Sequence, residues 1–291
     1  MAQDFTRKQV AALERRYDFK TAKSLGQNFV TDPAVTEGII AAAGAGPKDL
    51  IIEVGPGLGV ITAKAAQSCG KLVAIEIDKK LLPILAETVG WQPNVKIINE
   101  DILKADLAQI VETERVLPDG SDAENVRLIG NLPYYITTPI LNKLMALPEL
   151  FSSITIMVQK EVAEKMMAAA GAKNYGVISI HVQYFCEIEY IMDVPKEVFL
   201  PQPKVDSAVL TLHVRKEKAA RVLDEGLFFE TVKAGFAQRR KTLSNSLTGV
   251  RGADRDKVLA ALEGAGIDPK RRAETLSIAE FAEVANRLAG Q

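Results

Sequence analysis

Cysteine and histidine are scarce in this chain. Cys69 and Cys186 are the only cysteines in 291 residues, and they lie far apart. Such a pair offers no disulfide framework and suits a reducing compartment. His181 and His213 are equally isolated, so no cluster with metal-ligand spacing can be assembled from the sequence. Both histidines lie in alternating apolar stretches, which predicts strand histidines, and we expect no metal site.

Long apolar runs are also absent. No stretch is long enough to span a bilayer. The first 20 residues are charged throughout and lack the apolar segment of an export signal, so we expect a cytoplasmic protein. Hydrophobic residues make up 47% of the chain and charged residues 25%, which are ordinary values for a globular protein.

The net charge of −1 conceals an uneven distribution. From Lys196 onward 17 Lys and Arg face 13 Asp and Glu, whereas the preceding residues carry 19 against 24. The first 25 residues are basic too, with six Lys and Arg against three acids. Basic ends around an acidic middle indicate a polyanionic partner, with solvated helix faces as the alternative explanation.

Predicted strands and helices alternate through the first part of the chain. An amphipathic helix over 7–17 is followed by a helix that Asp32 caps and Pro33 begins. The strands predicted next cover 49–55, 71–78, 94–101, 127–131 and 153–159, with helices over 59–70, 79–90, 138–147 and 160–171. Residues 112–125 are a polar excursion. This order predicts a parallel, doubly wound sheet.

The pattern changes after residue 175. Residues 176–194 and 205–214 have long, partly alternating sequences, which predicts an antiparallel strand pair that completes the sheet. Beyond about residue 215 only helices are predicted, over 227–247, 254–266 and 277–290. We therefore predict an α/β domain over 1–214, including the basic N-terminal helix, and a small all-α domain over 215–291.

A glycine-rich turn follows the first strand of the alternating region, in "IIEVGPGLGVIT". Gly55, Gly57 and Gly59 allow a tight turn and a close approach to a ligand, although a plain loop would use the same residues. Glu76 ends the next strand, 21 residues after Gly55, where an acid accepts hydrogen bonds from ribose hydroxyls. Asp101 follows the third strand and is placed to meet an adenine amino group.

Two nucleotide cofactors fit such a site. A dinucleotide fingerprint needs Gly or Ala where this chain has Val60, and no residue is an evident partner for hydride transfer. The glycine turn with the two acids therefore favours S-adenosylmethionine over NAD. The amides of Gln27 and Asn28, just upstream, are candidate donors to its methionine carboxylate.

The stretch "RLIGNLPYYITTPI" ends the fourth strand on Asn131, at the same sheet edge. An exocyclic aromatic amine presented there could donate its hydrogens to the Asn131 side-chain oxygen and the Leu132 carbonyl. Pro133 has a fixed φ and would hold that carbonyl in one direction. Tyr134 offers a face on which an extruded base can stack. The alternative is a simple turn at the end of the strand.

Taken together, these motifs make the sequence resemble the ribosomal RNA adenine dimethyltransferases over nearly its whole length. The resemblance is carried by "SLGQNFVTDPAV", "IEVGPGLGVIT", "AIEID", "NEDILKADL", "NLPYYITTPI" and "FLPQPKVDSAVLTL", in the family's order and spacing. It implies a class I S-adenosylmethionine-dependent methyltransferase fold, Rossmann-like, with a mostly parallel seven-stranded sheet. It also implies dimethylation of two adjacent adenosines near the 3′ end of 16S rRNA in the small ribosomal subunit.

The resemblance also implies roles for individual residues. The implied cofactor contacts are Asn28, Val30 through its backbone, Gly55, Glu76, Asp101 and Asn131, to which the local pattern adds Gln27 and Gly57. Asn131, Leu132, Pro133 and Tyr134 form the implied catalytic motif. Phe199 supplies a second aromatic wall for the target base or packs in the core, and we expect Tyr135 to pack.

Three other functions stay open from the sequence. Methyltransferases that modify one adenosine of 23S rRNA and confer resistance share the glycine turn and an N-[IL]-P-[YF] motif. "KVDSAVLTL" and "FAQRRKTLSNSL" are more similar to the small-subunit branch, and Arg239, Arg240 and Lys241 are candidate phosphate contacts on a helix. A binding protein that acts as an assembly checkpoint on the small subunit, and an NAD-dependent oxidoreductase, are the remaining alternatives. We expect a monomer.

Overall fold

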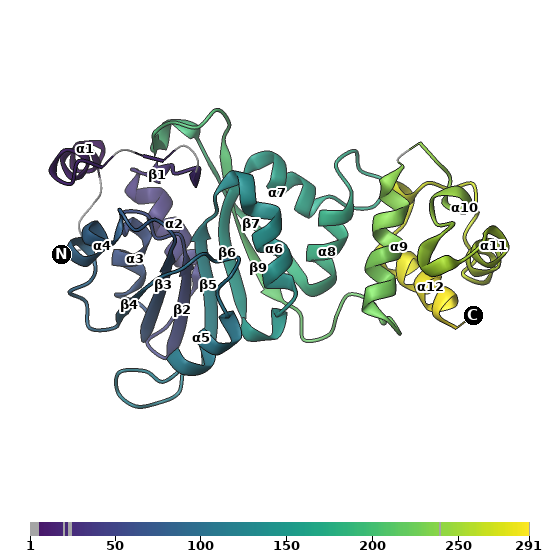
Figure 1. Cartoon of the computed structure of the whole chain (residues 1–291), viewed down its shortest axis with the longest axis horizontal. Helices are drawn as coiled ribbons and strands as arrows, with labels where there is room; N and C mark the ends of the chain where they lie inside the picture. The colour runs from purple at the N-terminus through teal and green to yellow at the C-terminus, as the bar shows by residue number, and fades with distance from the viewer. Residues whose placement is uncertain (1–5, 20, 23–24, 239, 291) are drawn as a thin grey trace. The chain divides into compact units, whose positions relative to one another are not determined.

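The structure, a computed structural model, describes residues 6–19, 21–22, 25–238 and 240–290 (Figure 1). The chain forms two compact units. An α/β unit comprises residues 1–163 and 188–214, and a helical unit comprises residues 164–187 and 215–291. The chain passes from the α/β unit to the helical unit for the last time after residue 214, which is where the sequence predicts the domain boundary. Residues 164–187, which the sequence placed in the first domain, belong to the helical unit.

A seven-stranded sheet forms the centre of the α/β unit, in the order β4-β3-β2-β5-β6-β9-β7. Its strands are β2 (Asp49–Val54), β3 (Lys71–Glu76), β4 (Val95–Asn99), β5 (Asn125–Asn131), β6 (Ser153–Gln159), β7 (Cys186–Val194) and β9 (Ser207–Val214). Neighbours from β4 to β6 pair in parallel, and β9 is antiparallel to β6. From β2 the chain moves first toward β4 and then back past β2 to β5, so the expected doubly wound, mostly parallel sheet is confirmed.

Helices α1 (Arg7–Arg16) and α2 (Pro33–Ala43) precede β2 along the chain. A helix then follows each strand from β2 to β6: α3 (Val60–Ala65), α4 (Leu82–Thr88), α5 (Leu107–Glu114), α6 (Thr137–Met145) and α7 (Lys160–Met167). The expected cap of α2 is confirmed, because the Asp32 side chain accepts the Ala34 amide. Helix α5 was not predicted; Asp106 caps it, and Leu107 and Val111 are buried.

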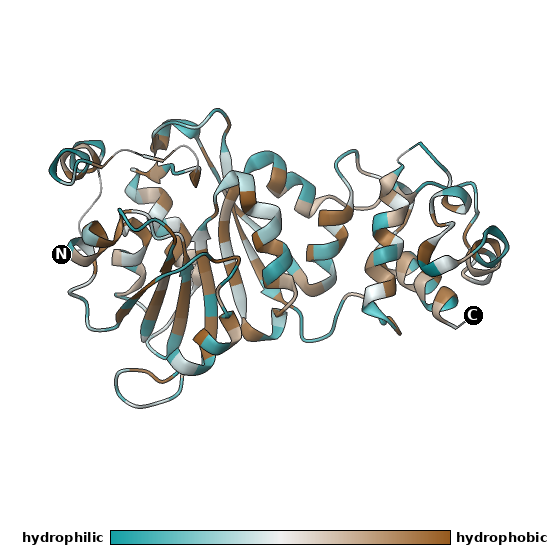
Figure 2. Cartoon of the chain, viewed as in Figure 1, coloured by the Kyte–Doolittle hydropathy of each residue, from teal (hydrophilic) through white to brown (hydrophobic). Residues whose placement is uncertain are grey.

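Strand β2 shows why the centre of the sheet has so apolar a sequence. All six residues of β2 are buried. Ile51 belongs to a core cluster with Ile39 of α2 and Ile61 of α3. Leu50 and Ile52, whose side chains point to the opposite face, are also fully buried. Burial on both faces requires the continuous hydrophobic segments that are brown in Figure 2.

The prediction of one long strand over 176–194 was wrong in its first half. Residues Val177–Phe185 form helix α8, and only Cys186–Val194 are extended. The apolar residues of this stretch satisfy both periods, and packing decides between them. Ile180 and Tyr184, one helical turn apart, are buried, and the Tyr184 ring lies 4.9 Å from Phe228. His181 is consequently a helical residue.

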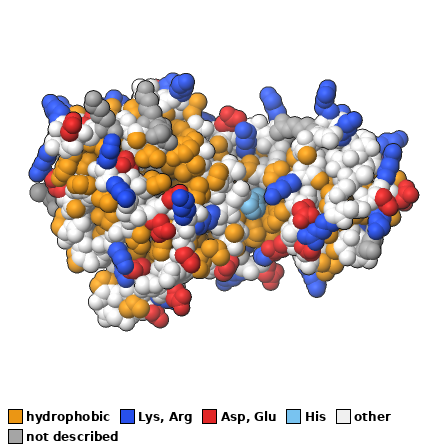
Figure 3. All heavy atoms as spheres, viewed as in Figure 1, with side chains coloured by type: hydrophobic (Ala, Val, Ile, Leu, Met, Phe, Trp, Pro, Cys, Tyr) orange, Lys and Arg blue, Asp and Glu red, His pale blue; other side chains and the backbone are white. Residues whose placement is uncertain are grey.

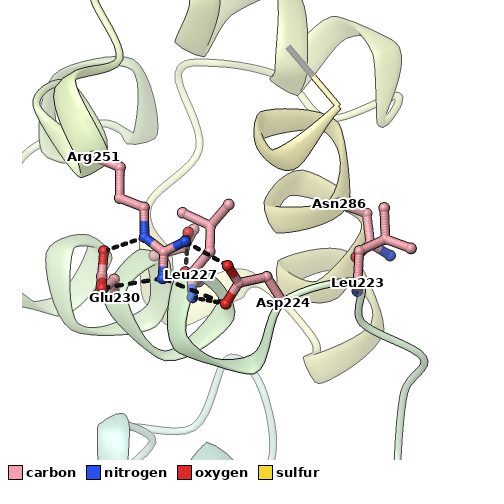
Figure 4. Close-up of polar contacts among 7 residues, drawn as sticks. Leu223, Asp224, Leu227, Glu230, Arg251 and Asn286 are labelled. Atoms are coloured by element: carbon pink, nitrogen blue, oxygen red, sulfur yellow. Dashed lines mark hydrogen bonds and ion pairs between the residues drawn. The ribbon is translucent and has the colours of Figure 1, made fainter.

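Four further helices belong to the helical unit: α9 (Glu225–Ala237), α10 (Leu243–Ser246), α11 (Arg255–Gly264) and α12 (Ile278–Ala289). Polar contacts fix the start of α9 (Figure 4). The Asp224 carboxylate accepts the Leu227 amide as the helix cap and pairs with Arg251, which also pairs with Glu230. Arg251 itself adopts a left-handed backbone conformation with φ +44°.

Two features are absent from the described residues. No helix within these ranges is long and apolar enough to cross a membrane. No group of three or more His, Cys, Asp or Glu residues there could hold a metal ion. His213, on β9, instead pairs with Glu189 at 2.9 Å.

Candidate active site

A pocket opens at the carboxyl ends of the central strands, where the strand order reverses between β2 and β5. It encloses about 970 Å³ of space, including its open mouth. The lining residues come from 25–30, 54–58, 60–61, 75–77, 81, 100–102 and 131–136. Such a crevice is the usual ligand site of an open α/β sheet. It brings together every predicted cofactor and catalytic residue except Phe199.

The glycine turn needs its glycines for two separate reasons. Gly55 and Gly57 have φ values of +68° and +60°, which side chains other than glycine rarely adopt. A Cβ atom on Gly57 would also lie 3.0 Å from the Phe29 ring. The turn therefore packs tightly against the 25–30 segment while its backbone lines the pocket.

Glu76, the last residue of β3, links this turn to the pocket. Its Oε2 accepts the Gly57 amide at 3.2 Å and its Oε1 accepts the Asp78 amide at 2.8 Å. The side chain is 4% exposed, and this burial raises the pKa of Glu76 to about 7. A carboxylate held this way is placed to accept hydrogen bonds from a ribose.

Glu53 is a second buried acid at this turn, and the sequence analysis missed it. It lies on β2, two residues before Gly55, and is 1% exposed. Burial, together with the charge of Glu76, raises the pKa of Glu53 to about 8. Its Oε2 has no hydrogen-bond partner in the described part of the chain. Burial thus favours the protonated form of Glu53. The signal for this residue in the sequence was an acid within a buried apolar segment.

The far wall of the pocket is apolar with one acid at its edge. Ile77 and Ile102 line it, the first 47% exposed and the second buried. The Asp101 carboxylate accepts the Leu103 amide at 2.9 Å, which fixes the side chain beside this wall. An apolar surface next to a hydrogen-bond acceptor suits the flat ring and exocyclic amine of adenine.

The two upstream amides differ in their surroundings. The Gln27 side chain accepts the Ala22 amide and donates to Asp78, both at 2.8 Å. It therefore ties the loop to the end of β3 through one of its two N–H hydrogens, and the residue lines the pocket. Asn28 donates to the Gly26 carbonyl, and its own carbonyl accepts a hydrogen bond from Asn131.

Asn131 and Leu132 present two acceptors to the pocket. The Asn131 amide nitrogen donates to Asn28 at 2.9 Å, which leaves Oδ1 as an acceptor. The Leu132 amide donates to Met157 of β6 at 3.1 Å, which anchors the motif to the sheet. Within the described ranges, no protein donor reaches Asn131 Oδ1 or the Leu132 carbonyl. The Pro133 carbonyl, by contrast, accepts the Ile136 amide and the Thr137 hydroxyl.

The two adjacent tyrosines are placed differently. Tyr134 is partly buried, and its hydroxyl lies 2.7 Å from the Ser207 hydroxyl. Burial raises the pKa of Tyr134, so the phenol stays neutral. Tyr135 was expected to pack, yet it is 54% exposed and lines the pocket. A Cβ on Gly26 would lie 3.0 Å from the Tyr135 ring, so this tyrosine lies over the 25–30 segment.

Phe199 does not reach the pocket. It lies in strand β8 (Phe199–Leu200), which pairs with β1 (Phe29–Val30) so that Val30 faces Phe199. Its ring is fully buried in the same core cluster as Val30. Phe199 therefore packs in the core, the second of the two roles considered for it, because strand pairing turns the ring inward.

The predicted basic helix is interrupted. Helix α9 ends at Ala237, and Arg240 and Lys241 lie exposed in the turn before α10. Arg239 lies outside the described residues. On the face shown in Figure 3, Lys and Arg are interspersed with Asp and Glu and form no single basic patch.

Comparison with known proteins identifies the group to which this chain is similar. The family model for ribosomal RNA adenine dimethylase matches residues 18–290. The chain is 47% identical over 277 residues to a ribosomal RNA small subunit methyltransferase A from Geobacillus kaustophilus, covering 94% of this chain and 93% of that protein.

Solved structures share the fold. A dimethyladenosine transferase from Plasmodium falciparum matches with a TM-score of 0.72 at 24% identity, covering 88% of this chain and 95% of that one. The 23S rRNA methyltransferase ErmE matches with a TM-score of 0.65 at 25% identity, covering 90% and 99%.

The pocket fits the cofactor that this group uses. The glycine turn, the Glu76 and Asp101 acceptors and the apolar wall match the backbone, ribose and adenine contacts that S-adenosylmethionine requires. The chain is thus an S-adenosylmethionine-dependent methyltransferase with a Rossmann-like sheet, and the NAD alternative is excluded. It belongs to the ribosomal RNA adenine dimethylase family.

Proposed function

We propose that this enzyme transfers methyl groups to N6 of two adjacent adenosines near the 3′ end of 16S rRNA, within the small ribosomal subunit. The observation that carries the proposal is a pair of acceptors, Asn131 Oδ1 and the Leu132 carbonyl, that no donor among the described residues reaches and that lie in the pocket with Tyr134. The small-subunit substrate is supported by relatives of that name at 44–47% identity, against 25% for the 23S enzyme.

The cofactor would be held by the residues nearest the glycine turn. Glu76 would accept the ribose hydroxyls, Asp101 the adenine amine, and the backbone of Gly55 and Val30 would line the remainder. When bound, S-adenosylmethionine supplies an electrophilic methyl group on a sulfonium ion.

Asn131 and Leu132 would orient the target amine. The N6 lone pair is delocalised into the adenine ring, so the nitrogen is a weak nucleophile. Accepting its two N–H hydrogens at Asn131 Oδ1 and the Leu132 carbonyl holds N6 in line with the methyl carbon. As the bond between N6 and the methyl carbon formed, the bond from that carbon to sulfur would break and the sulfur would keep its electron pair. The N–H protons would become acidic, and one would leave to water. No strong base is required from the chain.

Tyr134 would supply the face for the extruded base. Stacking on a tyrosine contributes about 1–3 kcal/mol per base.

The second methyl transfer would use the same two acceptors. The monomethylated amine has only one N–H left to donate, so one of the two acceptors suffices for it.

The proposed function also implies an RNA partner and a cellular location for this enzyme. We infer that the helical unit contacts rRNA through Arg239, Arg240 and Lys241, and that the protein acts as a cytoplasmic monomer. Clustered exposed cations favour phosphate binding through counterion release. A checkpoint role on the immature subunit would require the same binding without methyl transfer.

The test is methyl transfer from labelled S-adenosylmethionine to undermethylated small subunits and, separately, to protein-free 23S rRNA. We expect label in the small subunit only. Label in 23S rRNA alone would indicate the resistance activity, and particle binding without label would indicate the checkpoint role.

A further inference from the structure

The Tyr134 ring is anchored at its far end. The phenol oxygen lies 2.7 Å from Ser207 Oγ, 73 positions later in the chain. The backbone of Tyr134 is set by a short 3₁₀ turn in which the Ile136 amide donates to Pro133. A hydrogen bond at the hydroxyl fixes the position of the phenol oxygen and so the direction of the axis about which the ring turns. Because a phenol O–H prefers to lie in the plane of its ring, the Ser207 contact also favours ring orientations whose plane points toward Ser207 Oγ.

Ser207 stands on a rigid part of the sheet. It is the first residue of β9, is fully buried, and faces Gln159 of β6 in the antiparallel ladder. The preceding Asp206 is held on two sides, since its carbonyl accepts the Lys160 amide and its carboxylate accepts the Lys196 amide, both at 3.0 Å. The hydroxyl that anchors Tyr134 thus has a fixed position.

Ser207 lies outside the pocket lining and contacts a residue that belongs to it. Tyr134 lines the pocket, whereas Ser207 is not among its described lining residues. Its hydroxyl would therefore act on a bound base through Tyr134 and not by direct contact. Burial raises the pKa of Tyr134, so the phenol stays protonated, and either hydroxyl can be the donor in this hydrogen bond.

We propose that Ser207 is a positioning residue for methyl transfer, whose hydroxyl holds the Tyr134 ring in the orientation against which the target adenine stacks. The inference rests on the proposed function of the pocket. It assigns a role to the serine of "KVDSAVLTL", a stretch remote in sequence from the Asn131–Tyr134 motif. Loss of one such hydrogen bond corresponds to about a 3- to 10-fold effect.

The test compares kcat and KM on undermethylated small subunits for Ser207→Ala, Ser207→Thr, Tyr134→Phe and the Ser207→Ala/Tyr134→Phe double variant. We expect each single deletion of a hydroxyl to lower kcat about 3- to 10-fold with an unchanged Kd for S-adenosylmethionine. The double variant should be no slower than either single one, because both remove the same contact. Ser207→Thr, which retains a hydroxyl, should recover most of the rate.

The chain offers a matched control. Thr155 and Thr211 form another buried hydroxyl pair across β6 and β9, 3.1 Å apart, away from the pocket. Thr211→Val should lower the melting temperature as Ser207→Ala does, yet leave kcat unchanged.

Each contrary outcome is distinguishable. Full activity of Ser207→Ala, or additive losses in the double variant, would overturn the role of Ser207 while leaving the proposed function intact. A wild-type enzyme that transfers no methyl group to small subunits would overturn the proposed function and, with it, this inference.

Discussion

The side-chain nitrogen of Asn131 donates a hydrogen bond to the backbone carbonyl of Asn28, 2.9 Å away. This contact joins the end of β5 to the N-terminal segment that covers the pocket. It also fixes the amide so that Oδ1, and not the nitrogen, is free to meet a substrate amine. Asn131 is therefore the residue whose replacement should separate methyl transfer from folding.

Asn131→Ala should reduce methyl transfer at least 100-fold, because misplacing a reacting group by about 1 Å costs a factor of this size. The melting temperature and the Kd for S-adenosylmethionine should change little, since other residues hold the cofactor. Single-turnover assays and calorimetry measure the two effects. Asn245→Ala, at an exposed position of helix α10 in the helical unit, is the control. Near-normal turnover of Asn131→Ala would remove it from the catalytic motif.

Cofactor affinity should depend on the ionisation of Glu76. Its pKa is raised by burial to about 7, and the ionised form is the better acceptor for ribose hydroxyls. The Kd for S-adenosylmethionine should therefore rise as the pH falls below 7, by up to about tenfold per pH unit. Glu76→Gln should bind more weakly at pH 8 and lose this dependence, whereas Glu112→Gln, exposed on α5, should behave as wild type. An unaltered pH profile in Glu76→Gln would contradict the assignment.

Glu53 should make the fold less stable as the pH rises. Its pKa is raised by burial from 4.5 to about 8, so between these values the unfolded chain binds fewer protons than the folded one. The free energy of unfolding consequently falls with increasing pH over this window. Glu53→Gln should remove this penalty and raise the melting temperature, relative to wild type, by several degrees at pH 8.5, at about 2–4 °C per kcal/mol. The difference should be smallest near pH 5. A constant difference across the window would show that Glu53 does not titrate there.

Gly57→Ala should weaken cofactor binding more than backbone strain alone explains. The new Cβ would lie 3.0 Å from the Phe29 ring, at a φ of +60°. Gly120→Ala imposes similar strain at φ +85° but meets no atom within 4 Å and lies outside the pocket. Both variants should lose about 1–2 kcal/mol of stability, and only Gly57→Ala should lose cofactor affinity. Equal affinities in the two variants would mean that the close approach at Gly57 is irrelevant to binding.

Neutralising Arg240 and Lys241 together should weaken binding to small subunits and flatten its dependence on salt. Each lost phosphate contact to single-stranded or loop RNA lowers the slope of log K against log salt concentration by about 0.7. Arg255→Gln/Lys257→Gln, two exposed cations at the start of α11, provide a charge-matched control. If both double variants bind alike, the turn between α9 and α10 does not contact RNA.

Local sequence signals predicted most of the α/β unit. Strands β2, β3 and β6 are almost entirely buried, so their sequences are largely apolar, and helices α3, α4 and α6 follow strands where they were expected. Helix α5, between β4 and β5, was not predicted. The pocket residues were predictable because they follow these strands directly. Asn131, Glu76 and Asp101 share one edge of the sheet for that reason alone.

Long-range contacts explain what the sequence did not predict. Helix α8 was read as a strand because its apolar pattern fits both periods, and contacts such as Tyr184 with Phe228 decide the outcome. Phe199 is turned into the core by the pairing of β8 with β1. The Ser207–Tyr134 contact joins segments 73 positions apart, and neither residue signals the other locally.

The central claim is dimethylation of two adjacent adenosines in the small subunit, and mass spectrometry of nuclease-digested 16S rRNA tests it most directly. Undermethylated subunits would be incubated with the wild-type enzyme or Asn131→Ala and with S-adenosylmethionine. We predict N6,N6-dimethyladenosine at two neighbouring positions near the 3′ end with the wild type, and none with the variant. Absence of that product with the wild type, or its formation with Asn131→Ala, would contradict the account.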